Sequence, residues 1–244
     1  MLLLTLIFVI AVLYSSAGFG GASGYLLVMS FFGIPANVMS STALVLNIFV
    51  STISFLNYYR AGHFRPNLLF PFLITSIPAA FLGGMFKLSQ QAYTSLLYGV
   101  LTYLALRMIF FPVLSDKSDW SPRPVPRWAA LVSGAVIGLL SGMIGIGGGI
   151  FLSPLIILTG WGNSKQAAAS AGAFIAINSL SGLIGRFQGG TFAFGAAQIP
   201  MLIAGLAGAL LGGHLGAINW SSAGVRRALG IILALAVSTY WFKL

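Results

Sequence analysis

Two clusters of glycine hold the residues most able to do chemistry in this chain. They are Gly18–Gly24, which reads GFGGASG, and Gly145–Gly149, which reads GIGGG. A glycine-rich break frees backbone N–H groups, and a helix that begins just after it points the positive end of its dipole into the gap. We expect such helices to begin near Ala22 and Gly149. Backbone chemistry of this kind is suited to binding a small anion.

Polar side chains follow each cluster on the next apolar segment. They are Ser40, Ser41, Thr42 and Asn47 in one case, and Ser170, Asn178 and Ser181 in the other. Asn178 and Ser181 share a helix face at i and i+3, whereas Thr42 and Asn47 share one only loosely. Such groups can donate hydrogen bonds to an oxyanion without bringing a full charge into a membrane. The predicted substrate site consists of Gly20, Gly21, Ala22, Thr42, Asn47, Gly147, Gly148, Gly149, Ser170 and Asn178.

Each of these residues also has a purely structural interpretation. Small residues spaced four apart, such as Gly134 and Gly138, commonly let helices pack closely. Ser and Thr hydroxyls in membrane helices usually bond to their own backbone. We favour a binding-site break for the duplicated clusters, because packing alone does not need a run such as Gly147–Gly149. The amides Asn47 and Asn178 are stronger candidates than the hydroxyls, because burying an amide without a partner is unfavourable.

The ionisable residues exclude several classes of protein. The only acidic residues, Asp116 and Asp119, lie in a polar, proline-rich stretch, so the apolar segments contain no carboxylate. Cation pumps and proton-driven carriers commonly use intramembrane carboxylates. With no cysteine and only two histidines, we expect no enzyme, metal site or cofactor. His214 is the one histidine well inside an apolar run, where it couples proton movement or, more simply, has a structural role.

The composition indicates a membrane protein. Apolar residues make up 58% of the chain and charged residues 6%, against about 25% charged in a soluble domain. The net charge is +10, but the basic residues sit at the ends of apolar runs rather than on one face, so we expect no nucleic-acid partner. The apolar segments are long enough to enter or span a bilayer. They cover residues 2–17, 20–33, 36–58, 68–86, 92–114, 128–143, 147–160, 166–187, 194–213 and 223–242.

The second set of segments repeats the first in order and spacing. The chain is therefore interpreted as two homologous halves, residues 1–114 and 128–244, joined by a cytoplasmic linker at 115–127. The first two segments of each half are about 12–16 residues long, which is short for a full span. They form either one broken span, which makes the halves parallel repeats, or a hairpin that returns to the same side, which makes them inverted repeats.

The distribution of basic residues favours the hairpin model slightly, because the cytoplasmic side should carry more of them. The hairpin model divides them nine to three, and the broken-span model eight to four. The nine are Arg60, Arg65, Arg107, Lys117, Arg123, Arg127, Lys165, Arg226 and Arg227. Both models place the linker in the cytoplasm. Arg107, Arg186 and Lys87 lie near segment ends, from which we expect their side chains to reach the membrane interface.

These features resemble the TauE/SafE family of membrane proteins, the sulfite exporters. In the first half the resemblance rests on Gly18-Phe19-Gly20-Gly21, Pro35-Ala36 and Ser41-Thr42-Ala43. In the second half it rests on Gly145–Gly149, Pro154, Ala168, Ser170, residues 178–182 and Gly212-Gly213. It covers nearly the whole chain and implies a plasma-membrane carrier of small sulfur-containing anions. The first cluster has Ala22 where the family commonly has a third glycine, so the two half-sites need not be equivalent.

The sequence thus predicts an all-α polytopic membrane protein, in which each half is a glycine-broken hairpin of short helices followed by three long transmembrane helices. The predicted function is secondary transport of sulfite, sulfoacetate or a related organosulfonate across the plasma (inner) membrane. The alternative is a non-transporting membrane subunit or sensor whose glycine clusters are packing seams. The expected partners are the anion, the lipid bilayer and a coupling ion, H⁺ or Na⁺. A homodimer is left open.

Overall fold

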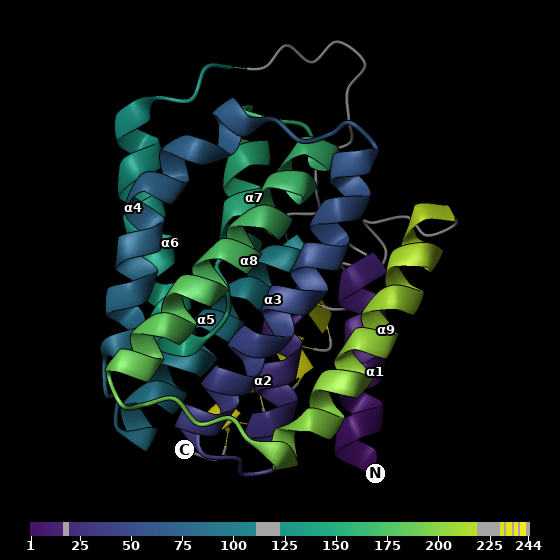
Figure 1. Cartoon of the computed structure of the whole chain (residues 1–244), viewed down its shortest axis with the longest axis vertical. Helices are drawn as coiled ribbons and strands as arrows, with labels where there is room; N and C mark the ends of the chain where they lie inside the picture. The colour runs from purple at the N-terminus through teal and green to yellow at the C-terminus, as the bar shows by residue number, and fades with distance from the viewer. Residues whose placement is uncertain are drawn as a thin grey trace.

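The computed structural model describes residues 1–16, 20–110 and 123–218, with the backbone alone over 213–218, and residues 230–242 apart from 232, 236 and 239. All regular structure in these residues is helical (Figure 1). The helices are α1 (Leu2–Ser16), α2 (Ala22–Phe31), α3 (Ala36–Arg60), α4 (Pro66–Met85), α5 (Gln90–Phe110), α6 (Arg127–Ile144), α7 (Gly149–Leu158), α8 (Ser164–Gln188), the short 3₁₀ helix η1 (Ala196–Gln198) and α9 (Ile199–Ile218). Residues 230–241 are also helical where they are described, and residue 242 forms a turn.

Five of the described helices are long and apolar enough to cross a membrane: α3, α4, α5, α6 and α8. Their outer faces carry large apolar side chains, such as Phe70 and Ile74 on α4, which are 60% and 67% exposed. Soluble monomers rarely expose continuous apolar surface of this kind, whereas lipid tails cover it favourably. The predicted all-helical membrane fold is therefore confirmed. Three of the helices expected to have about 12–16 residues differ in length: α6 has 18 residues, and α2 and α7 have 10 each. Helix α6 is longer because it extends at both ends beyond the apolar run predicted at 128–143.

The two longest helices, α3 and α8, lie against each other in the centre of the bundle. On one flank α4 packs against α6 and α8, and on the other α9 packs against α1 and α3 (Figure 1). Of the short helices, α2 contacts α3 and α1, and α7 contacts α8. Helices from early and late in the chain thus alternate across the molecule, so the core forms only when both parts of the chain are present.

The bundle has two ends, which can be told apart by their connections. At the linker end, the Arg123 N–H donates to the Gly160 carbonyl over 2.9 Å, so α6 starts beside the point where α7 stops. At the N-terminal end, the Ala36 N–H donates to Gln90 Oε1, also over 2.9 Å, which joins the start of α3 to the start of α5. The pair α6–α7 therefore enters and leaves the bundle at one end, as a hairpin does.

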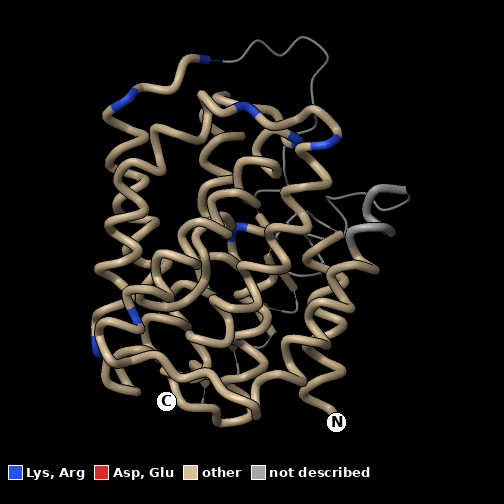
Figure 2. Tube along the Cα trace, viewed as in Figure 1, with Lys and Arg blue, Asp and Glu red and all other residues tan. Residues whose placement is uncertain are grey.

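Most of the described basic residues lie toward these two ends, with more of them at the linker end, although Figure 2 also shows blue near mid-height of the bundle. Helix boundaries account for the arrangement at the linker end: Arg60 closes α3, Arg65 precedes α4 and Arg127 opens α6. No acidic side chain is present in the part of the chain that the structure describes, because Asp116 and Asp119 lie outside it. His214 has no described side chain, and Gly18 lies outside the described residues.

Candidate functional site

Two glycine breaks interrupt the helices inside the bundle, and the helix after each one starts where the sequence predicts. The first break, Gly20–Gly21, precedes α2, which begins at Ala22; the second break, Gly145–Gly148, precedes α7, which begins at Gly149. The residue before each helix, Gly21 or Gly148, has a φ near +80°, a conformation that favours glycine. Neither helix has a side-chain cap. The positive end of each helix dipole is therefore directed into its break without a capping hydrogen bond from a side chain, although the Tyr25 ring and hydroxyl lie over Gly21.

Asn47 of α3 and Ile175 of α8 bring the two breaks together. A Cβ atom added to Gly20 would lie 2.9 Å from Asn47 Oδ1 and 3.2 Å from Ile175 Cγ2. A Cβ atom added to Gly147 would meet the same two side chains, at 2.8 Å from Asn47 Nδ2 and 2.6 Å from Ile175 Cγ2. Asn47 also donates a long hydrogen bond of 3.4 Å from Nδ2 to the Gly145 carbonyl, while its Oδ1 has no partner. The amide thus lies between the two breaks; its unpaired atom is an acceptor, so an anion would have to be bound through Nδ2.

The space between the breaks is closed in this conformation. A cavity of about 10 Å³ lies there, and residues of both breaks line it, among them Gly20, Ser23, Ile146 and Ile175. That volume has room for about one water molecule. A sulfur oxyanion is several times larger, so the neighbouring side chains must move before one can enter.

The other predicted polar residues are buried, but they do not all reach the breaks. Asn178 donates from Nδ2 to the Phe174 carbonyl one turn earlier in its own helix, over 2.9 Å, and its Oδ1 has no partner. The hydroxyls of Thr42 and Ser170 are fully buried without a hydrogen-bond partner. None of these three side chains is among the nearest neighbours of the break glycines that the structure describes. The structure therefore brings together Gly20, Gly147 and Asn47 and leaves the three other groups as polar positions deeper in α3 and α8.

A separate set of glycines serves helix packing. Cβ atoms added to Gly134, Gly138 and Gly142 of α6 would lie 2.4, 2.4 and 2.0 Å from backbone oxygens of α4. Only glycine allows two helix backbones to approach so closely. This seam differs from the breaks, where the atoms nearest to Gly20 and Gly147 belong to side chains. The structural interpretation is thus correct for the spaced glycines of α6.

Arg186 of α8 departs from the sequence prediction. Its side chain was expected to extend to the membrane interface, but only 3% of the residue is exposed. The guanidinium donates from Nη2 to the carbonyls of Gly142 and Met143, over 2.9 and 2.7 Å. The prediction failed because these acceptors belong to α6, which is distant in sequence. Glycines one and four residues before Arg186, at 185 and 182, were the available signal of close helix contact.

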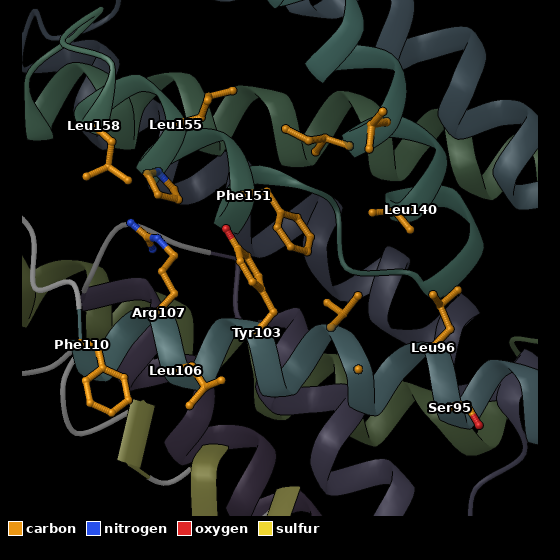
Figure 3. A pocket seen from close by; sticks show the side chains of 15 residues that line it. Ser95, Leu96, Tyr103, Leu106, Arg107, Phe110, Leu140, Phe151, Leu155 and Leu158 are labelled. Carbon is orange, nitrogen blue, oxygen red and sulfur yellow. The ribbon is translucent and has the colours of Figure 1, made fainter.

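A wide apolar groove lies elsewhere, between α5 and the α6–α7 hairpin (Figure 3). Its volume is about 1040 Å³, and Figure 3 shows Tyr103 and Phe151 facing each other across it, with Arg107 toward the end where Leu158 lies. None of the predicted site residues lines this groove. Its lining is almost entirely apolar, which offers few donors to a small anion.

Comparison with known proteins identifies the family. Residues 3–240 match the family described as "Sulfite exporter TauE/SafE". The chain is 34% identical over 235 residues to "Probable membrane transporter protein y4hK" of Sinorhizobium fredii, an alignment that covers 94% of this chain and 93% of the relative. A protein of Methanocaldococcus jannaschii, also named a probable membrane transporter, is 25% identical over 216 residues, which cover 83% of this chain and 79% of that protein. No solved structure gives a significant match. With its all-helical fold and a family match over nearly its whole length, the chain belongs to the TauE/SafE family of membrane transporters.

Proposed function

We propose that this protein is a secondary transporter of small sulfur-containing anions, namely sulfite, sulfoacetate or related organosulfonates, across the plasma membrane. The observation that carries the proposal is that Gly20 and Gly147, each two residues before the start of an uncapped helix, both lie against Asn47. Such ends can bind anions through backbone N–H groups and the helix dipole, without a charged side chain in contact with the anion. The family description supports the choice of sulfite as the first substrate to test.

The proposed site lies between the first and second breaks. Backbone N–H groups at Ala22 and Gly149 supply donors, and Asn47 orients the anion between them. Thr42, Ser170 and Asn178 are second candidates, which become neighbours of the anion only if the closed cavity enlarges toward them. The buried hydroxyls of Thr42 and Ser170 have no hydrogen-bond partner and could donate to an anion, which supports this role. The unpaired atom of Asn178 is its amide oxygen, which only accepts, so Asn178 would have to bind the anion through Nδ2.

The site fits a chain of two inverted repeats, residues 1–114 and 128–244. The support is the pattern of connections: α6–α7 returns to the linker end, whereas the N-terminus from which α1 starts lies at the opposite end (Figure 1). Two short hairpins that enter from opposite sides and meet at their glycine breaks are a common way to build a substrate site near the bilayer midplane. The linker at 115–127 is proposed to lie in the cytoplasm, together with the more basic end of the bundle.

Transport into liposomes tests the proposal directly. Purified protein is reconstituted, and uptake of labelled sulfite is measured in competition with sulfoacetate, other organosulfonates, sulfate and chloride, with pH and Na⁺ gradients varied separately. We expect saturable uptake that sulfur oxyanions inhibit and that one of the two gradients drives. Uptake no faster than in protein-free liposomes across the whole panel would favour a subunit or sensor without transport activity.

A further inference from the structure

Arg186 is a buried cation in a part of the chain that contains no acid to balance it. The protein has two acidic residues in total, Asp116 and Asp119, and both belong to the polar linker stretch. Burying a guanidinium inside the bundle without a counter-ion is unfavourable, and buried charges are usually paired or bound to a ligand. A neutral amide could have capped the same carbonyls. The positive charge at this position therefore requires its own explanation.

The carbonyls that Arg186 binds form the C-terminal end of α6, just before the second break. The same end receives two more side-chain donors: the Tyr93 hydroxyl donates to the Ile144 carbonyl over 2.8 Å, and Asn47 reaches the Gly145 carbonyl. Four consecutive carbonyls, from Gly142 to Gly145, are thus capped from α8, α5 and α3. Each of these four carbonyls, which lack a partner within the helix, therefore accepts a hydrogen bond from a side chain of another helix.

This capping changes the electrostatics of the second break. A broken helix presents two ends at its gap, and the C-terminal end carries roughly half a negative charge, which repels an anion. The guanidinium adds a full positive charge at that end, so the net charge at the end of α6 becomes positive, at about half an elementary charge. The start of α7 contributes a further positive end to the same break. Arg186 Nε, moreover, has no hydrogen-bond partner.

We propose that Arg186 is the specificity-determining residue of the anion site: its fixed charge cancels the negative end of α6 and makes the second break prefer doubly charged anions to singly charged ones. The inference rests on the proposed function and deepens it by naming the charge class of the substrate. Coulomb energy scales with the charge of the ligand, so one fixed cation stabilises a dianion about twice as strongly as a monoanion at the same place.

The test compares two sulfonates of similar size and different charge. Sulfoacetate carries two negative charges at neutral pH, and propanesulfonate carries one. Binding constants are measured by titration calorimetry on protein in nanodiscs, for the wild type and for Arg186→Gln, Arg186→Met and Arg186→Lys. Lys87→Met is the matched control, because Lys87 is an exposed cation outside the site, between α4 and α5.

We expect the wild type to prefer sulfoacetate by about tenfold or more, equivalent to about 1.4 kcal/mol. The Gln and Met variants should lose most of that preference, the Lys variant should keep most of it, and Lys87→Met should leave it unchanged. A purely structural role for Arg186 would weaken both ligands equally and leave their ratio intact, which would overturn the inference.

If Arg186→Gln and Arg186→Met do not fold, the ratio of the sulfoacetate and propanesulfonate binding constants of the wild type tests the inference by itself. A wild type that binds both sulfonates equally contradicts the inference alone and leaves the proposed function standing. A wild type that binds neither sulfonate nor sulfite contradicts the proposed substrate class, and the inference with it.

Discussion

The two glycine breaks look alike in sequence but are held in different ways. In the first hairpin, formed by α1 and α2, a hydrogen bond of 2.7 Å joins the hydroxyls of Tyr14 and Ser23, and the Tyr25 side chain folds back over Gly21. The second break is fixed by donors from three other helices, one of them charged. The central helices differ accordingly. Counted from the first residue of each helix, Asn47 of α3 corresponds to Ile175 of α8, and Tyr58 of α3 corresponds to Arg186 of α8. A repeated backbone motif can thus provide two half-sites with different electrostatics.

Gly148→Val should have the largest effect and should separate the breaks most clearly. The new side chain would enter a backbone with φ near +79°, and its Cβ would lie 2.7 Å from Ile137 and 2.8 Å from Phe174. Backbone strain alone is worth about 1–3 kcal/mol, and the branched side chain would block the approach of an anion to the backbone. We expect uptake in liposomes to be abolished while folded protein is still recovered, in reduced yield, by size-exclusion chromatography.

The matched control is Gly99→Ala, because nothing lies within 4 Å of a Cβ atom at this helical glycine. That variant should be unchanged in uptake and slightly stabilised, by about 0.5–1 kcal/mol. Normal transport by Gly148→Val would mean that the glycines of the second break serve packing only.

Asn47→Ala should weaken sulfite binding more than Asn178→Ala. Asn47 lies between both breaks, and removing it leaves the Gly145 carbonyl without its side-chain partner, so a loss of roughly 1–3 kcal/mol is expected. Asn178 already donates a hydrogen bond within its own helix, so the binding free energy lost in Asn178→Ala should lie at the lower end of that range. Titration of sulfite into each purified variant measures the difference. The reverse ranking would move the anion from the breaks toward the interior of α8.

Tyr93→Phe and Tyr14→Phe compare the stability of the two hairpins. Without its hydroxyl, Tyr93 leaves the Ile144 carbonyl buried and unpaired, a loss of about 1–3 kcal/mol. The partner of Tyr14 is a serine hydroxyl, which can turn to its own helix backbone, so Tyr14→Phe should have a smaller effect. Thermal unfolding in detergent, monitored by intrinsic fluorescence, should show the larger decrease for Tyr93→Phe. Equal decreases would indicate that the second break is no more firmly held than the first.

Ser118→Cys should have no effect on transport, and it reports on which side the second hairpin enters. The chain has no native cysteine, so a membrane-impermeant thiol reagent would label only this position. Labelling is expected only after the cells are opened, since the linker is predicted to be cytoplasmic. Labelling of intact cells would reverse the proposed orientation of both hairpins.

Sequence reasoning reached the parts of this protein that depend on local rules. The starts of α2 at Ala22 and α7 at Gly149 follow from glycine conformation, and the long helices other than α6 follow from apolar length. The role of Arg186 could not be found in this way, because an arginine near the end of an apolar run is usually interfacial. Its burial depends on α6 crossing α8 at Gly142 and Gly182, where a Cβ atom added to Gly182 would lie 3.2 Å from the Cα atom of Gly142. Such contacts arise only when the halves of the chain pack together.

The bonds at the end of α6 also limit how the transporter can move. They join four helices, α3, α5, α6 and α8, at one point inside the bundle. Pulling α6 away would leave several carbonyls unpaired in a region without water, at several kcal/mol for each group. We therefore expect these four helices to move as one rigid body during transport. The hinge that admits the substrate then has to lie in α7 and in the α1–α2 hairpin, because the hydrogen bonds at the end of α6 do not hold these helices.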